Sequence, residues 1–277
     1  AWKAKLLEDL FRAAQRLLTG DHAALETSME SRQAEARAKL RLYAVPEHAE
    51  DKLWAQLETP YFLRHEPAEI AWHTRHLHYR VGTTKPVVKT RLSPAGEGLQ
   101  VMVYLPDQKE LFARICSFFE SIRYDIIEAK IYTTRDGYAL DTFQVHDPDN
   151  RDAQYRDLIS YIEYELGQRL EHRTPLPVLT QPRLNRQLRH FPISPEVDIQ
   201  PDERNTCQVL SIIAGDRPGL LSRIARVLVK YEINLQTAKI NTLGSRAEDV
   251  FIITGAALHD AKRVVKLESD LLEQLRT

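Results

Sequence analysis

The stretch Asp216–Thr242, DRPGLLSRIARVLVKYEINLQTAKINT, decides the fold. Its apolar residues recur every three or four positions over 218–231, which is the period of an amphipathic helix. Pro218 suits the first turn of that helix, and Gly219 lets a ligand or another backbone approach closely. Alternating apolar and polar residues indicate a strand over 233–241. The stretch therefore predicts a loop, a helix and a strand in succession.

The same order of elements is expected twice along the chain. The second copy comprises strands over 206–213, 233–241 and 247–254 and helices over 218–231 and 260–275. The first comprises strands over 99–105, 125–134 and 137–146 and helices over 109–122 and 151–170. Residues 109 positions apart, or 108 after a one-residue gap, are identical: Asp107 and Asp216, Leu111 and Leu220, Arg114 and Arg223, Ile115 and Ile224, Ala129 and Ala238, Lys130 and Lys239, Ile131 and Ile240, Thr133 and Thr242, Asp141 and Asp249, Phe143 and Phe251. This repetition predicts two copies of one small α+β module.

The residues before the first copy predict helices alone. An apolar stripe over 6–18 is followed by a helix over 21–43, a short helix with Leu53, Trp54 and Leu57, and a helix from Pro67 to Tyr79. We therefore expect an α+β chain in four parts. These are a helical segment over 1–82, a first module with its leading strand (VVKTRL) over 83–172, a proline-rich linker with a candidate edge strand over 173–204, and a second module over 205–277.

The composition argues against several classes of function. The 277 residues include 38 Lys and Arg and 39 Asp and Glu, for a net charge of −1, so neither nucleic acid nor an anionic membrane is an expected partner. The apolar runs are too short to span a bilayer, and no signal peptide is predicted. Cys116 and Cys207 fit neither a zinc motif nor a disulfide framework. A cytoplasmic protein is expected, and a first residue other than Met is consistent with a piece of something longer.

The loop before the helix at 218 allows two interpretations. A phosphate site is disfavoured, because the loop lacks the pattern G-x-x-x-x-G-K-[ST] and Asp216 would repel the anion. An amino acid fits better: free N–H groups at a helix N-terminus favour its carboxylate, and Asp216 or Asn234 can accept bonds from its ammonium group. Alternatively, Asp216 caps the helix and Gly219 permits close packing. The residues alone favour neither interpretation.

With the EDVFII that follows at Glu248–Ile253, this stretch resembles an ACT domain, a ferredoxin-like βαββαβ module that binds amino acids. The resemblance implies a site, commonly shared between two modules, with Asn234 on one wall and a loop on the other: Asp216, Arg217, Pro218, Gly219, Leu220 and Leu221. The first copy, PDQKELFARI, keeps Asp107 and Leu111 but has Lys109 and Glu110 in place of Pro and Gly, and Asp125 stands where Asn234 stands in the second. The first copy is therefore expected to bind differently, to bind poorly, or to serve as the partner surface.

Four longer stretches extend the resemblance over almost the whole chain: YFLRHEPAEIAWHTRHL, IYTTRDGYALDTFQV, RQLRHFPISPEV and INTLGSRAEDVFIITG. They resemble the C-terminal region of the bacterial bifunctional uridylyltransferase/uridylyl-removing enzymes that modify the PII signal protein in nitrogen control. The resemblance implies a regulatory part that senses L-glutamine. Its expected partners are the N-terminal catalytic domains of the same enzyme, PII through those domains, and a second copy of the chain through the ACT sheets.

The sequence offers little for catalysis. The one Asp-x-Asp pair, Asp147 and Asp149, has no Gly-Ser loop before it and is interpreted as a turn. The His-Asp pairs His146–Asp147 and His259–Asp260 recur at equivalent turns, which favours capping. The catalytic domains are thus expected outside this chain, with no cofactor here and magnesium only in the transferase of the complete enzyme. The alternatives are a ligand-free ACT pair used for assembly, or a metal phosphohydrolase that uses His73 and His76.

Overall fold

The computed structural model describes residues 22–94, 96, 98–147, 155–176, 193–202, 207–217, 219–243 and 245–276. The chain forms two compact units: Ala1–Thr83 with Thr134–Asp136, and Thr84–Thr133 with Gly137–Thr277. The helix expected over 6–18 and most of the proline-rich linker lie outside the described residues.

The first unit consists of helices in its described part. They are α2 (His22–Leu42), α3 (Asp51–Trp54), α4 (Thr59–Arg64) and α5 (Pro67–Leu77). Helix α2 packs against α4 and α5, and Leu53, Phe62 and Ile70 are buried in the core. Helix α4 was not expected from the sequence, because its six residues are too few to show a helical period.

The second unit contains both copies of the module and confirms the α+β fold. The first copy comprises β1 (Val87–Leu92), β2 (Leu99–Pro106), α6 (Leu111–Ser121), β3 (Asp125–Lys130), β4 (Tyr138–His146) and α7 (Tyr155–Glu171). The second comprises β5 (Glu196–Pro201), β6 (Gln208–Gly215), α9 (Leu220–Lys230), β7 (Asn234–Lys239), β8 (Thr242–Leu243), β9 (Arg246–Thr254), the 3₁₀ helix η1 (Ala256–His259) and α10 (Ala261–Arg276). Each copy therefore follows the order β-αββα after a leading strand.

The described strands of the two copies join in one continuous sheet. Its order is β1-β2-β4-β3-β7-β9-β6-β5, with β8 paired to β9. Strands β1, β2, β4 and β3 of the first copy are equivalent to β5, β6, β9 and β7 of the second, so the order is the same from either edge of the sheet. At the centre, β3 and β7 run antiparallel with Ala129 opposite Ala238, the same position in the two copies. The two modules are therefore related by an approximate twofold axis between these strands.

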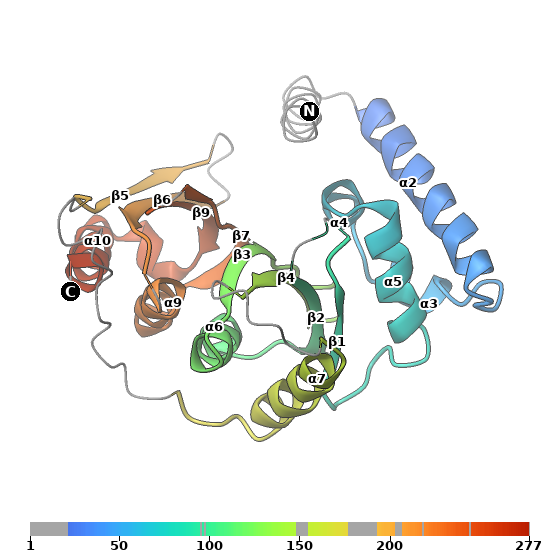
Figure 1. The fold of residues 1–277 in the computed structure, drawn as a ribbon. Coiled ribbons are helices and arrows are strands. Elements are labelled where there is room, and N and C mark those ends of the chain that lie inside the picture. Colours follow the sequence, from blue (N-terminus) through green and yellow to red (C-terminus); the bar gives the residue numbers. More distant parts are fainter. Residues whose placement is uncertain are drawn as a thin grey trace. The chain divides into compact units, whose positions relative to one another are not determined.

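The helices of this unit cover one face of the sheet, in the order α7, α6, α9, α10 (Figure 1). Helices α6 and α9 pack side by side below β3 and β7, and the Oγ atoms of Ser117 and Ser222 lie 2.9 Å apart between them. The apolar residues of both helices form a single core with the inner face of the sheet. The modules consequently share one core rather than touching only at a strand edge.

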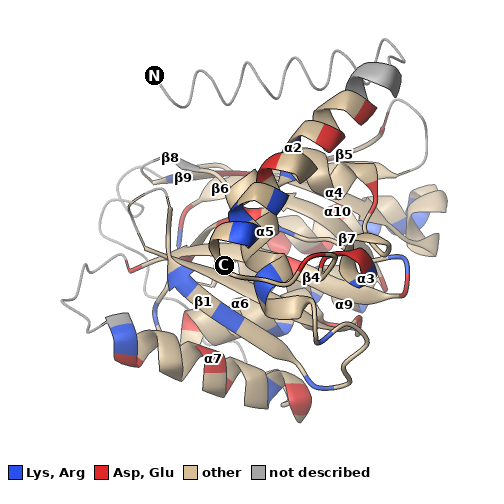
Figure 2. Ribbon diagram, turned by 90° about the vertical axis from the view of Figure 1, so that its right-hand side faces the viewer, with Lys and Arg blue, Asp and Glu red and all other residues tan. Residues whose placement is uncertain are grey.

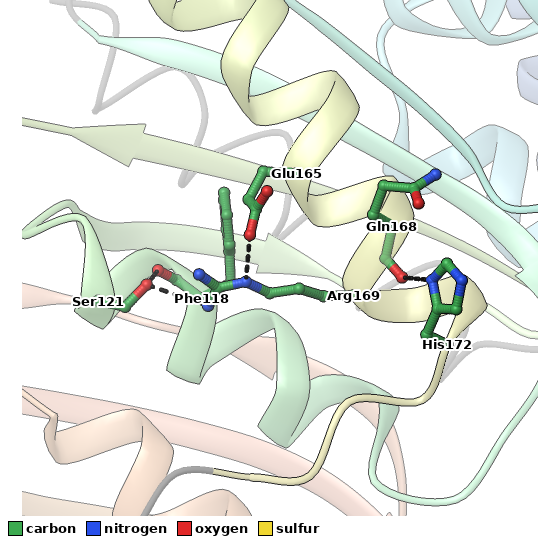
Figure 3. Close-up of polar contacts among 6 residues, drawn as sticks. All are labelled: Phe118, Ser121, Glu165, Gln168, Arg169 and His172. Atoms are coloured by element: carbon green, nitrogen blue, oxygen red, sulfur yellow. Dashed lines mark hydrogen bonds and ion pairs between the residues drawn. The ribbon is translucent and has the colours of Figure 1, made fainter.

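Arg169 joins helix α7 to α6, as Figure 3 shows, and the ring of Tyr161 in α7 also stacks on Phe118. The guanidinium of Arg169 lies over the ring of Phe118 at 5.2 Å and donates to Ser121 Oγ at 3.3 Å. It also donates to Glu165 Oε1 at 3.1 Å within α7. At the end of α7, His172 Nδ1 lies 2.8 Å from the carbonyl oxygen of Gln168. The contacts of Arg169 with Phe118 and Ser121 thus join the last helix of the first module to α6.

Acidic and basic residues are interspersed along the described helices and strands (Figure 2), in keeping with the net charge of −1. Within the described ranges, no helix combines the length and the apolar character needed to cross a membrane. Both cysteines are free thiols; Cys116 is buried and Cys207 is partly buried.

Candidate functional site

Each module has a loop between its first core strand and its first helix, and the described residues of the two loops share two backbone features. Glu110 and Gly219 are the N-caps of α6 and α9, with φ of 67° and 80° respectively. The loops are tied to the following hairpin: the N–H of Asp107 donates to the carbonyl of Gly137 at 2.9 Å, and that of Asp216 donates to the carbonyl of Ser245 at 2.8 Å. The two loops are therefore alike at their N-caps and at their contact with the hairpin, and they differ in side chains.

A cavity of about 470 Å³ lies at the first loop, between the two modules. The first copy contributes residues 107–113, which include the loop and the first turn of α6. The second copy contributes Ala225, Leu228 and Val229 from α9 and residues 232–235, where β7 begins. Its lining combines apolar side chains with several polar ones, which is the usual character of a small-molecule site.

The structure pairs the loops and second strands across the modules. The resemblance implies a site, commonly shared between two modules, with Asn234 opposite the loop at Asp216; in the structure Asn234 lines the cavity beside Asp107 of the first loop. Asp125 correspondingly lies near Asp216: burial raises the pKa of Asp216, and the charge of Asp125 raises it further. The physical reason is the antiparallel pairing of β3 with β7, which brings the start of each second strand to the loop of the other copy.

The rim of the cavity carries several polar side chains. Thr133 Oγ1 donates to Asp107 Oδ2 at 3.4 Å, and burial raises the pKa of that carboxyl. Lys109 and Glu232 form an exposed ion pair between the modules at 3.6 Å, which contributes little stability. Glu110 Oε2 accepts a bond from Arg114 Nη2 at 2.9 Å and is thereby held along its own helix.

Gln108 is a candidate that sequence reasoning missed. It lines the cavity, and its Nε2 is buried without a hydrogen-bond partner among the described residues. A buried donor of this kind is destabilising unless a ligand or water accepts from it. The signal in the sequence is positional: Gln108 is equivalent to Arg217, so each loop has a polar donor at this place.

The described residues of the second loop contact α10 and the core. Arg217 Nη2 donates to the carbonyl of Gln274 at 2.6 Å, near the end of α10. Leu220 is buried in the core, and Leu221 is partly buried against it. Pro218 lies outside the described residues. Leu220 therefore packs in the core, and Arg217 is directed to α10.

A buried aspartate holds the hairpin of each module. Asp141 Oδ1 accepts from the N–H of Tyr132, and Asp249 Oδ1 accepts from the N–H of Asn241, both at 3.2 Å. Burial raises the pKa of Asp249 to about 7, and the charge of Asp216 adds to this effect. The repeated aspartate thus has the same structural contact in both copies.

The histidines of the helical unit form part of its core. His73 is fully buried, and its Nδ1 lies 2.6 Å from Tyr61 Oη. Across the described ranges, no three His, Cys, Asp or Glu side chains gather as ligands for a metal. In the second His-Asp pair, Asp260 Oδ1 accepts from the N–H of Lys262 at 2.9 Å, which caps the start of α10.

Comparisons with known proteins agree with this architecture. The family model described as the fifth domain of uridylyltransferase GlnD matches residues 24–76, and the ACT domain model matches residues 208–272. The chain is 53% identical over 276 residues to a bifunctional uridylyltransferase/uridylyl-removing enzyme of Chromobacterium violaceum, covering 99% of this chain and 32% of that protein. The enzyme of the same name from Ralstonia nicotianae is 51% identical over 279 residues, with the same two coverages. The chain therefore spans about a third of the length of these relatives.

Proposed function

Because this chain belongs to the family of the bifunctional uridylyltransferase/uridylyl-removing enzymes, we propose that it is the part that senses L-glutamine in such an enzyme. Glutamine bound between the modules would shift the balance between attaching UMP to the PII protein and removing it. The catalytic domains that carry out both reactions would lie in the rest of the longer enzyme.

The observation that carries the proposal is the cavity between the two modules. Its volume of about 470 Å³ falls in the range of small-molecule sites, roughly 300–1,000 Å³. The first turn of α6 offers N–H groups to a carboxylate, because the first four N–H groups of a helix have no partner within it. Asp107 and Asn234 can accept bonds from an α-ammonium group, and the buried amide of Gln108 can donate to an oxygen of the ligand. These groups match an α-amino acid with a polar side chain.

Regulation follows from the position of the cavity. Its walls belong to both modules, so a bound ligand contacts both and favours one mutual arrangement over another. A ligand shifts such an equilibrium only when it binds the two arrangements with different affinities. The change in arrangement is the signal that would be passed to the catalytic domains.

Titration calorimetry with L-glutamine tests this function, with L-glutamate and L-asparagine as comparison ligands. Asn234→Ala and Gln108→Ala are each expected to weaken glutamine binding by roughly 5- to 150-fold, because a lost bond in a desolvated site costs about 1–3 kcal/mol. Gln236→Ala is the matched control, since Gln236 is exposed on the same strand, β7, and does not line the cavity.

Two results would contradict the proposal. Equal affinity in the natural protein and both cavity variants would remove the cavity as the site. No heat with any amino acid would favour the assembly role instead, in which the modules pair within a chain, or between chains, without a ligand.

A further inference from the structure

The approximate twofold axis creates two equivalent places at the junction of the modules. One is the cavity, where the first loop faces Val229 of α9 and Asn234 of β7. The other is the place where the second loop faces α6 and β3. On α6, the residue equivalent to Val229 is Glu120, 109 positions earlier. The two places are therefore built from equivalent elements and carry different side chains.

Each place has one glutamate, but the two glutamates come from different elements. At the first, the N-cap is Glu110 and the facing helix contributes Val229. At the second, the N-cap is Gly219 and the facing helix contributes Glu120. A Cβ built on Gly219 would lie 2.9 Å from Glu120 Cδ, so this carboxylate lies directly against the backbone where α9 begins. Glu110, by contrast, folds back to Arg114 and leaves the cavity open.

The charges around Glu120 favour its position. A carboxylate is stabilised at the N-terminus of a helix by the aligned peptide dipoles. Burial lowers the pKa of Arg226 on α9, and the charges of Glu120 and, less strongly, of Glu110 oppose that change, so both carboxylates lie near this guanidinium. The carboxylate of a free amino acid would require the same position and would be repelled there. Asp125 and Asp216 add further negative charge on this side.

We propose that Glu120 is an internal carboxylate that closes the second place, so that the chain binds one amino acid, at the first loop. This inference rests on the proposed function and adds the number and position of the sites. It gives Gly219 a specific role: the residue leaves room for the carboxylate of Glu120, which any side chain at this position would displace.

The stoichiometry of L-glutamine binding, measured by titration calorimetry on the whole chain, tests the inference. One ligand per chain is expected for the natural protein. Glu120→Val, which copies the residue at the equivalent position of α9, is expected to bind two. Glu268→Val is the matched control, because Glu268 is a partly buried glutamate on α10, and this variant should keep one ligand.

A second pair of variants locates the ligand without altering Glu120. Asn234→Ala should lose most of the binding, whereas Asp125→Ala, at the equivalent position of the first copy, should keep it. Three results would overturn the inference and leave glutamine sensing intact. They are two ligands bound to the natural protein, loss of binding in Asp125→Ala but not in Asn234→Ala, and one ligand bound to a folded Glu120→Val variant. No binding to the natural protein would overturn the proposed function as well.

Discussion

The stability of Asp249→Asn relative to the natural protein is expected to rise by about 3 kcal/mol between pH 5 and pH 8. Burial, together with the charge of Asp216, raises the pKa of Asp249 from 3.8 to about 7 in the folded state. Between these two values the folded protein holds a proton that the unfolded chain has released, so the free energy of unfolding falls as the pH rises towards 7. At about 1.4 kcal/mol for each pH unit, the loss approaches about 4 kcal/mol above pH 7.

The amide of the variant keeps the contact that the carboxyl makes. Its oxygen can still accept from the N–H of Asn241, as Asp249 Oδ1 does, and the other carboxyl oxygen has no partner among the described residues to lose. Urea unfolding at both pH values measures the effect, with an unchanged dependence on urea showing that the same surface is exposed. The same decline in stability from pH 5 to pH 8 in both proteins would contradict the prediction. The difference at pH 5, where Asp249 is largely protonated in the folded state, is the reference against which the gain at pH 8 is measured.

The order of elements could be predicted from the sequence because each element has its own local pattern. The amphipathic pattern of α9 and the alternation in β9 need no knowledge of the partner strand or helix. The repeat strengthened each prediction, since every element of the first copy was supported by its equivalent in the second. Helix α4 was missed because its six residues, TPYFLR, form less than two turns.

The candidate site could be predicted only in part. The loops at Asp107 and Asp216 were identified, but their partners depend on which strand edges meet, and β3 and β7 are far apart in the sequence. Ala129 and Ala238 are one of the ten identities between the copies, but the sequence does not indicate that these two residues pair across the sheet. Glu120 belongs to no motif, because its importance arises only from its contact with Gly219.

Phe251→Ala is expected to lower the free energy of unfolding of the second unit, which contains both modules, by about 3–5 kcal/mol, the usual loss for a buried phenylalanine. Phe251 is fully buried in β9, opposite Leu210 in β6 and Ala238 in β7. Because the pairing of β3 with β7 and the packing of α6 on α9 join both modules in one core, the whole unit should unfold in a single, earlier transition.

Far-ultraviolet circular dichroism during urea unfolding measures this transition, with Phe251→Leu as the control that retains most of the buried volume. Phe143→Ala, the equivalent change in the first module, should shift the same transition by a similar amount. Two separate transitions, of which each variant moves only its own, would instead show that the modules fold independently, and a ligand would then have to assemble the junction as it binds.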